Sequence, residues 1–68
     1  MYEYRVVETT AEDGSPIYGL ALYINGRQLC ALPHLSADRQ RMEQIAALCT
    51  KEQVEPIHMQ DVVYDMLH

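Results

Sequence analysis

Four side chains have the chemistry of metal ligands, and they are Cys30, His34, Cys49 and His58. Two thiolates and two imidazoles form a set that zinc binds in tetrahedral geometry. The sequence contains neither a Cys-x-x-Cys pair nor a His-x₃₋₅-His pair, the spacings typical of zinc fingers and ribbons. We therefore favour two packed, unreactive cysteines, and we expect neither a metal nor another cofactor.

Cys30 and His34 are also the only neighbouring pair that could form a nucleophilic site. Such a site needs a thiol or hydroxyl beside a base that a third group orients. Pro33 separates the two residues and leaves their relative directions undefined, while Cys49 falls on an apolar helix stripe where burial makes a thiol inert. No glycine-rich loop is present to bind phosphate. We expect no catalytic residues and no enzymatic activity.

The balance of charge is acidic, with 10 acidic and 5 basic residues and a formal net charge of −5. This balance disfavours direct binding to nucleic acid, because phosphate binding depends on Lys and Arg. An acidic chain can instead imitate nucleic acid and block a basic site on a partner protein. Asp61 and Asp65 stand on one helix face, but a solvated surface that favours solubility explains this charge density equally well.

The chain has 68 residues, which is enough for a single small domain, 1–68. It has no run of roughly 18 apolar residues, so we expect no membrane-spanning segment. Its N-terminus lacks the charged and then apolar pattern of a signal peptide. These features predict a cytoplasmic protein in which Cys30 and Cys49 stay reduced.

Three segments have the patterns of strands. Apolar and charged residues alternate in 2–10, an apolar run occupies 17–24, and 27–32 forms a third strand that Pro33 ends. Asp13-Gly14 favours a turn, and Asn25-Gly26 suits a two-residue type I′ hairpin. The segments therefore predict an antiparallel three-stranded meander.

A two-residue loop at Asn25-Gly26 also fixes the expected register of the second hairpin. It sets Leu22 opposite Leu29 and Leu20 opposite Ala31, so that these residues share one face with Tyr18. The opposite face then carries Ile17, Gly19, Ala21, Tyr23, Cys30 and Leu32.

Two amphipathic helices are predicted after the strands, at about 36–51 with Ser36 as N-cap and at about 58–67. Their apolar stripes are Met42, Ile45, Ala46 and Cys49, and Met59, Val62, Val63 and Met66. The expected fold is α+β, with both helices packed on the Leu20 face of the sheet. The other face stays open.

Four segments resemble a family of short bacterial domains of unknown function. They are 18–22 (Tyr-Gly-Leu-Ala-Leu), 35–38 (Leu-Ser-Ala-Asp), 45–49 (Ile-Ala-Ala-Leu-Cys) and the closing segment 55–67. The closing segment carries the pattern Pro-x-His-x-x-Asp-Val-x-x-Asp-x-Leu, its most specific part. The resemblance implies a bacterial cytoplasmic origin, a meander followed by two helices, and no known activity. In that segment we favour a capping role for His58 at the start of the second helix, with Asp61 in the first turn as its capping partner.

The open sheet face motivates the functional hypothesis. An apolar face without helices to cover it usually binds a partner. We expect a small interaction or accessory domain that binds another protein, or a second copy of itself, through Tyr23, Ile17 and Leu32. The alternative is the acidic inhibitor that blocks a basic site.

Overall fold

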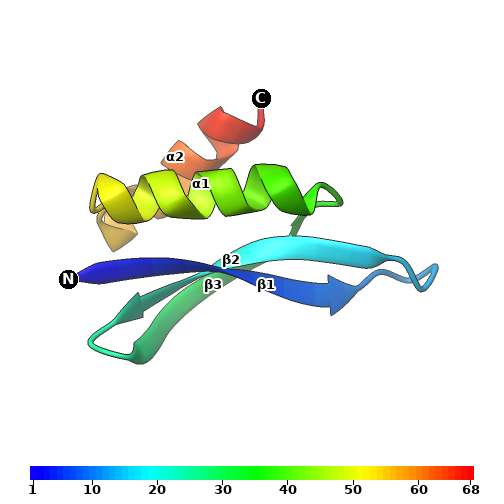
Figure 1. The fold of residues 1–68 in the computed structure, drawn as a ribbon, viewed down its shortest axis with the longest axis horizontal. Helices are drawn as coiled ribbons and strands as arrows, with labels where there is room; N and C mark the ends of the chain where they lie inside the picture. Colours follow the sequence, from blue (N-terminus) through cyan, green and yellow to red (C-terminus); the bar gives the residue numbers. More distant parts are fainter.

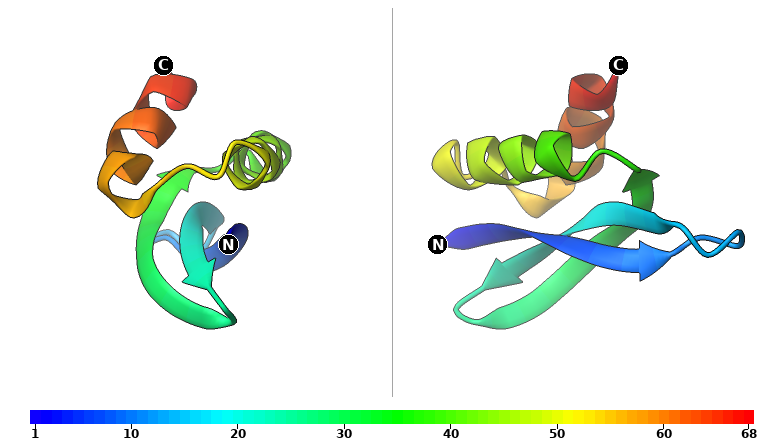
Figure 2. Two further views of the ribbon diagram at one scale, coloured as in Figure 1. Left: turned by 90° about the vertical axis from the view of Figure 1, so that its left-hand side faces the viewer. Right: turned by 45° about the vertical axis from the view of Figure 1, so that its right-hand side comes forward.

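The computed structural model describes residues 1–68 and contains three strands and two helices (Figure 1). Their bounds are β1 Tyr2–Thr10, β2 Pro16–Ile24, β3 Arg27–Ser36, α1 Arg39–Lys51 and α2 Pro56–Leu67. The strands form one antiparallel sheet in the order β1-β2-β3. Both helices lie on the same side of this sheet, with α1 on the side of β1 and α2 on the side of β3 (Figure 2). The α+β fold predicted from the sequence is confirmed.

The first hairpin follows the alternation of β1. Tyr4 pairs with Leu22 and Val6 with Leu20, so the even-numbered residues of both strands point toward the helices. The connecting turn is held by Asp13, whose carboxylate accepts hydrogen bonds from the amide and the hydroxyl of Ser15. These bonds lower the pKa of Asp13.

The second hairpin begins as predicted and then departs from the predicted register. Asn25 and Gly26 adopt φ values of 51° and 81°, as a type I′ turn requires, and Ile24 pairs with Arg27. Tyr23 then pairs with Gln28 but Leu22 pairs with Cys30, so Leu29 is the extra residue of a β-bulge. The predicted pairs Leu22–Leu29 and Leu20–Ala31 are therefore wrong.

The bulge changes which side chains of β3 face the helices. Leu32 pairs with Leu20 and packs against the core, whereas Leu29 is 52% exposed. A one-residue shift moves every following side chain to the opposite face of a strand. It places the larger Leu32 in the core and leaves Ala31 outside, which buries more apolar surface than the predicted register would.

β3 also continues past Pro33 to Ser36, beyond the predicted end at Leu32. A second irregularity makes this continuation feasible, because residues 33–35 of β3 stand opposite Gly19 alone. His34 adopts φ 60° within it. Gly19 is required here, since a Cβ at this position would lie 2.2 Å from the carbonyl oxygen of Leu32. Proline is tolerated on an edge strand at such a bulge.

The core is entirely apolar and lies between the sheet and the helices. Its buried side chains are Tyr4, Leu20, Leu22, Met42, Ile45, Ala46, Cys49, Met59 and Val63. The stripes of both helices contribute as predicted, with Val62 and Met66 packed at the margin. This single cluster explains how such a short chain orders two separate helices on one sheet.

The helix starts differ from the predicted ones. Asp38, and not Ser36, is the N-cap of α1, and its carboxylate accepts a hydrogen bond from the amide of Arg41 at 3.1 Å. α2 begins at Pro56, which suits the first helical position because it has no N–H. His58 therefore lies inside the helix, where its amide donates to the Glu55 carbonyl, and the predicted capping role is wrong.

Candidate protein-interaction site

The four predicted metal-ligand candidates are dispersed over the molecule. Cys30 lies on β3 with its sulfur 3.5 Å from that of Met59, Cys49 is buried in α1, and His58 is exposed on α2. No three His, Cys, Asp or Glu side chains come together in an arrangement that could hold a metal ion. Burial raises the pKa of the Cys49 thiol and keeps it in the unreactive protonated form.

The predicted interaction residues Tyr23, Ile17 and Leu32 do not share a surface. Leu32 faces the helices because of the bulge at Leu29. Tyr23 and Ile17 remain on the outer face of β2, six residues and therefore about 20 Å apart. The grouping predicted from the sequence is wrong, because it depended on the regular register.

The outer face between Tyr23 and Ile17 offers little apolar surface. Gly19 and Ala21 occupy it, and both are already buried by neighbouring strands and side chains. The guanidinium of Arg5 stacks on the Tyr23 ring at 4.2 Å from its centroid and also pairs with Glu3 at 2.9 Å. This face therefore has less apolar area than the sequence pattern predicts.

The outer edge of β1 has a more informative structure, and its first half is closed by side chains. The Gln53 amide donates to the Tyr2 carbonyl and accepts from the Tyr2 amide, both at 2.9 Å. The Thr50 hydroxyl accepts from the Tyr4 amide at 2.9 Å and lies 2.9 Å from the Ala46 carbonyl. These contacts replace the neighbouring strand that an edge lacks.

The second half of the same edge is open. Backbone groups in an antiparallel strand alternate in direction, so the amides of Val6, Glu8 and Thr10 point outward like those of Tyr2 and Tyr4. No hydrogen bond from another part of the chain reaches them. A backbone segment that presents free N–H and C=O groups in this way can pair with an incoming strand.

A groove of about 380 Å³ runs beside this open half, between β1 and α1. Its walls are Tyr4, Val6, Glu8, Tyr18, Arg39, Glu43, Ala46 and Ala47. The small side chains of Ala46 and Ala47 create the space, because they leave α1 without bulk above Val6. The volume lies at the lower end of the roughly 300–1,000 Å³ that ligand pockets occupy.

The charges of the groove are unevenly paired. Arg39 and Glu43 form an ion pair at 3.4 Å across one turn of α1. The chain has one other ion pair, between Arg5 and Glu3. Glu8 therefore has no ion-pair partner within the chain. The groove therefore carries one uncompensated negative charge beside the open strand edge.

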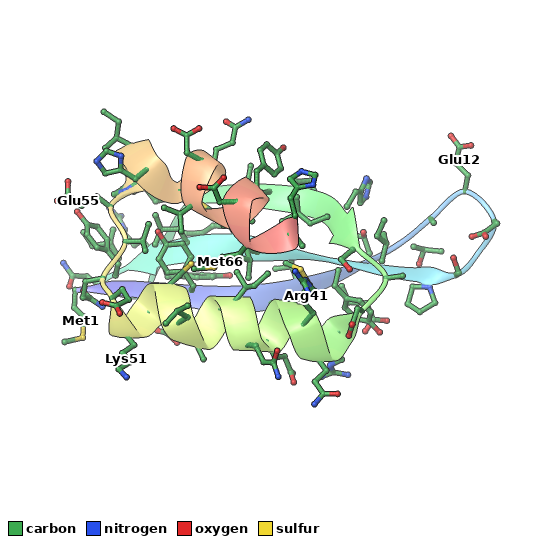
Figure 3. The ribbon with its side chains drawn as sticks, turned by 90° about the horizontal axis from the view of Figure 1, so that it is seen from above. Met1, Glu12, Arg41, Lys51, Glu55 and Met66 are labelled. Carbon is green, nitrogen blue, oxygen red and sulfur yellow. The ribbon has the colours of Figure 1, made fainter.

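A second, more polar hollow of about 800 Å³ lies where β3 ends and the two helices approach. It contains His34, Ser36, Arg41, Tyr64 and His68. Arg41 donates to the Met66 carbonyl, which links the two helices (Figure 3). The Ser36 hydroxyl accepts from the Asp38 amide, and no hydroxyl or thiol of the chain is hydrogen-bonded to an imidazole.

The roles of Thr50 and Gln53 and the groove were not predicted from the sequence. The meander order could have identified β1 as an edge strand, since consecutive strands usually pair. The position of α1 along β1 has no such local signal. It depends on the packing of the helix stripe against Tyr4 and Leu22.

The structure contains no helix long and apolar enough to cross a membrane. No curated protein and no solved structure matches the chain. One family model matches residues 1–68, and its description is "Family of unknown function (DUF6514)". The match covers the full length, in agreement with the resemblance to a family without a known activity. The chain therefore belongs to the DUF6514 family of unknown function.

Proposed function

We propose that this chain is a non-enzymatic protein-interaction domain that binds an extended segment of a partner protein along β1. The observation that carries the proposal is the half-open edge of β1. Side chains of Thr50 and Gln53 close the edge at Tyr2 and Tyr4, and the edge from Val6 to Thr10 is open beside the groove. A partner strand would extend the sheet and place alternate side chains in the groove.

The length of the open edge limits the bound segment. Residues 6–10 span about 14 Å at roughly 3.4 Å per residue. A ligand of about five residues could pair there before it met the side chain of Thr50. The sheet would then have four strands, which is within the usual range.

The alternative of an acidic mimic has weaker support. Two of the carboxylates, Glu3 and Glu43, are paired with arginines. Glu12 and Glu55 lie at opposite ends of the molecule (Figure 3), and the remaining acidic side chains are divided among the first turn, β1, the two caps of α1, and α2. Imitation of a phosphate backbone needs a contiguous acidic surface.

The proposal is tested with a displayed library of random linear nonapeptides selected on the immobilised domain. Enriched peptides are then titrated against the wild type, Glu8→Ala and Glu8→Pro by fluorescence anisotropy. Both variants lack the carboxylate, and Pro alone lacks the outward N–H. We expect Glu8→Pro to bind at least tenfold more weakly than Glu8→Ala, because the ring blocks pairing at the edge.

Proline at an outward-facing position of an edge strand is compatible with the fold, and circular dichroism checks this for the variant. A second measurement avoids the variant. Methylation of the peptide amides that pair with β1 should abolish binding, whereas methylation of the alternate amides should be tolerated. The proposal would be overturned if the selection enriched no linear peptide. It would also be overturned if the two protein variants bound a peptide equally well and the two methylated peptides bound the wild type equally well.

A further inference from the structure

We infer that the bound segment carries an apolar residue and, two positions away, a lysine or arginine. This inference rests on the proposed function and specifies its partner. Residues of an added strand alternate between the two faces of the sheet, so those at i and i+2 both point into the groove in either strand direction. Their surroundings differ because they stand opposite Val6 and Glu8.

The position opposite Val6 is apolar. Val6, Tyr4, Ala46 and Ala47 surround it, and the alanines leave space above the strand. A Val, Ile or Leu side chain of the ligand would bury its apolar surface there.

The position opposite Glu8 favours a positive charge. Glu8 lies at the free edge, and its carboxylate has no basic partner in the chain. Arg39 stands on the same groove, but its charge is already offset by Glu43 at 3.4 Å. Opposite charges across a strand pair are favourable and like charges are unfavourable. The net charge of −5 adds a long-range attraction for a basic segment.

These charges also argue against a second copy of this chain as the occupant. An antiparallel pair of β1 strands can set Glu8 opposite Glu8, or Glu8 opposite an uncharged residue, Val6 or Thr10. The first arrangement opposes like charges, and the second leaves each carboxylate without a partner. None of the three β1 residues at the open edge, Val6, Glu8 and Thr10, is basic. A partner segment with a basic residue can pair with the Glu8 carboxylate, which neither arrangement of a second copy does.

The test uses the peptides enriched in the selection described above, divided by their sensitivity to Glu8→Pro. We expect the sensitive peptides to share an apolar residue and a Lys or Arg two positions apart. Replacing that basic residue by Gln should weaken binding to the wild type by roughly three- to fivefold at low salt. The same replacement should change binding to Glu8→Gln by less than about twofold, because the coupling is lost.

Glu12→Gln is the matched control, because it removes one negative charge at the tip of the first hairpin, outside the groove (Figure 3). It should retain the full effect of the basic residue. An equal loss of coupling in Glu8→Gln and Glu12→Gln would mean long-range attraction alone and would overturn the inference. Proline-sensitive peptides without a basic position would overturn it while leaving the proposed function intact. A wild-type dimer that Glu8→Pro dissociates would identify the second copy as occupant instead.

Discussion

The two halves of the β1 edge have the same strand geometry and opposite surroundings. Tyr2 and Tyr4 direct their backbone groups to Gln53 and Thr50, which satisfy them at 2.9 Å. Val6, Glu8 and Thr10 point the same way and find no partner. The difference arises from α1, because its C-terminal end lies above the N-terminal end of β1 (Figure 1).

A small sheet can thus protect one part of an edge strand and leave another part of the same strand open. An unprotected edge strand carries a risk of aggregation, which proteins usually reduce by covering or charging it. Here one half is covered by two polar side chains, and the other carries Glu8. A charged side chain on an open edge discourages pairing with unselected strands and leaves room for a partner of opposite charge.

The largest expected difference between the halves is in stability. Tyr4→Ala removes a core side chain that is 5% exposed and should lower the free energy of unfolding by about 3–5 kcal/mol. Glu8→Ala changes an exposed residue on the same face and should alter it by no more than about 0.5 kcal/mol. Urea unfolding of the two variants measures both values. Similar losses of unfolding free energy in Tyr4→Ala and Glu8→Ala would show that the two halves of the edge are packed alike.

The contribution of the side chains that close the edge is tested at Gln53, which adopts φ 50°. Gln53→Ala removes the two bonds to Tyr2 and should cost about 1–2 kcal/mol of unfolding free energy. Gln53→Gly loses the same bonds but relieves the left-handed conformation, so it should be about 1 kcal/mol more stable than Gln53→Ala. Thermal unfolding ranks the two, and a glycine variant less stable than the alanine variant would contradict this account.

A loss of stability about the size of one hydrogen bond is expected for Tyr4→Phe. The Tyr4 hydroxyl donates to the Val54 carbonyl at 2.6 Å, and its loss should cost about 1 kcal/mol near neutral pH. Burial is the main cause that raises the pKa of Tyr4 to about 12. The unfolded value is about 10, so the protonated hydroxyl stabilises the fold fully below pH 10.

That stabilisation should disappear as the pH rises from 10 to 12. The difference in unfolding free energy between the wild type and Tyr4→Phe should therefore shrink over this interval, as measured by denaturant unfolding at a series of pH values. A difference that stays constant up to pH 12 would be inconsistent with the buried hydroxyl.

The order and type of the elements were predictable because local signals agree. Alternation in β1, the Asn25-Gly26 turn and the stripe that includes Met42 and Ile45 each indicate one conformation, and the structure confirms them. The register of β3 was not predictable in this way. A bulge at Leu29 is favoured by where Leu32 packs in three dimensions, which the spacing of residues along the strand does not reveal.

The candidate site was hidden for the same reason. Tyr23, Ile17 and Leu32 were grouped from an ideal register, and the bulge separates them. The closed half of the edge joins Tyr2 to Gln53, which are 51 residues apart in the sequence. Such a contact follows from the packing of α1 on the sheet, and no local pattern near Gln53 predicts it.

Amide hydrogen exchange of the wild-type domain, measured residue by residue by NMR, tests the central claim most directly. The amide of Tyr4 is bonded to Thr50, so it should exchange slowly, whereas the amides of Val6 and Glu8 should exchange close to their intrinsic rates. Tyr4 and Glu8 lie on the same strand and point the same way, which makes the comparison internal. Protection of Glu8 equal to that of Tyr4 would show that the edge is covered and would contradict the account.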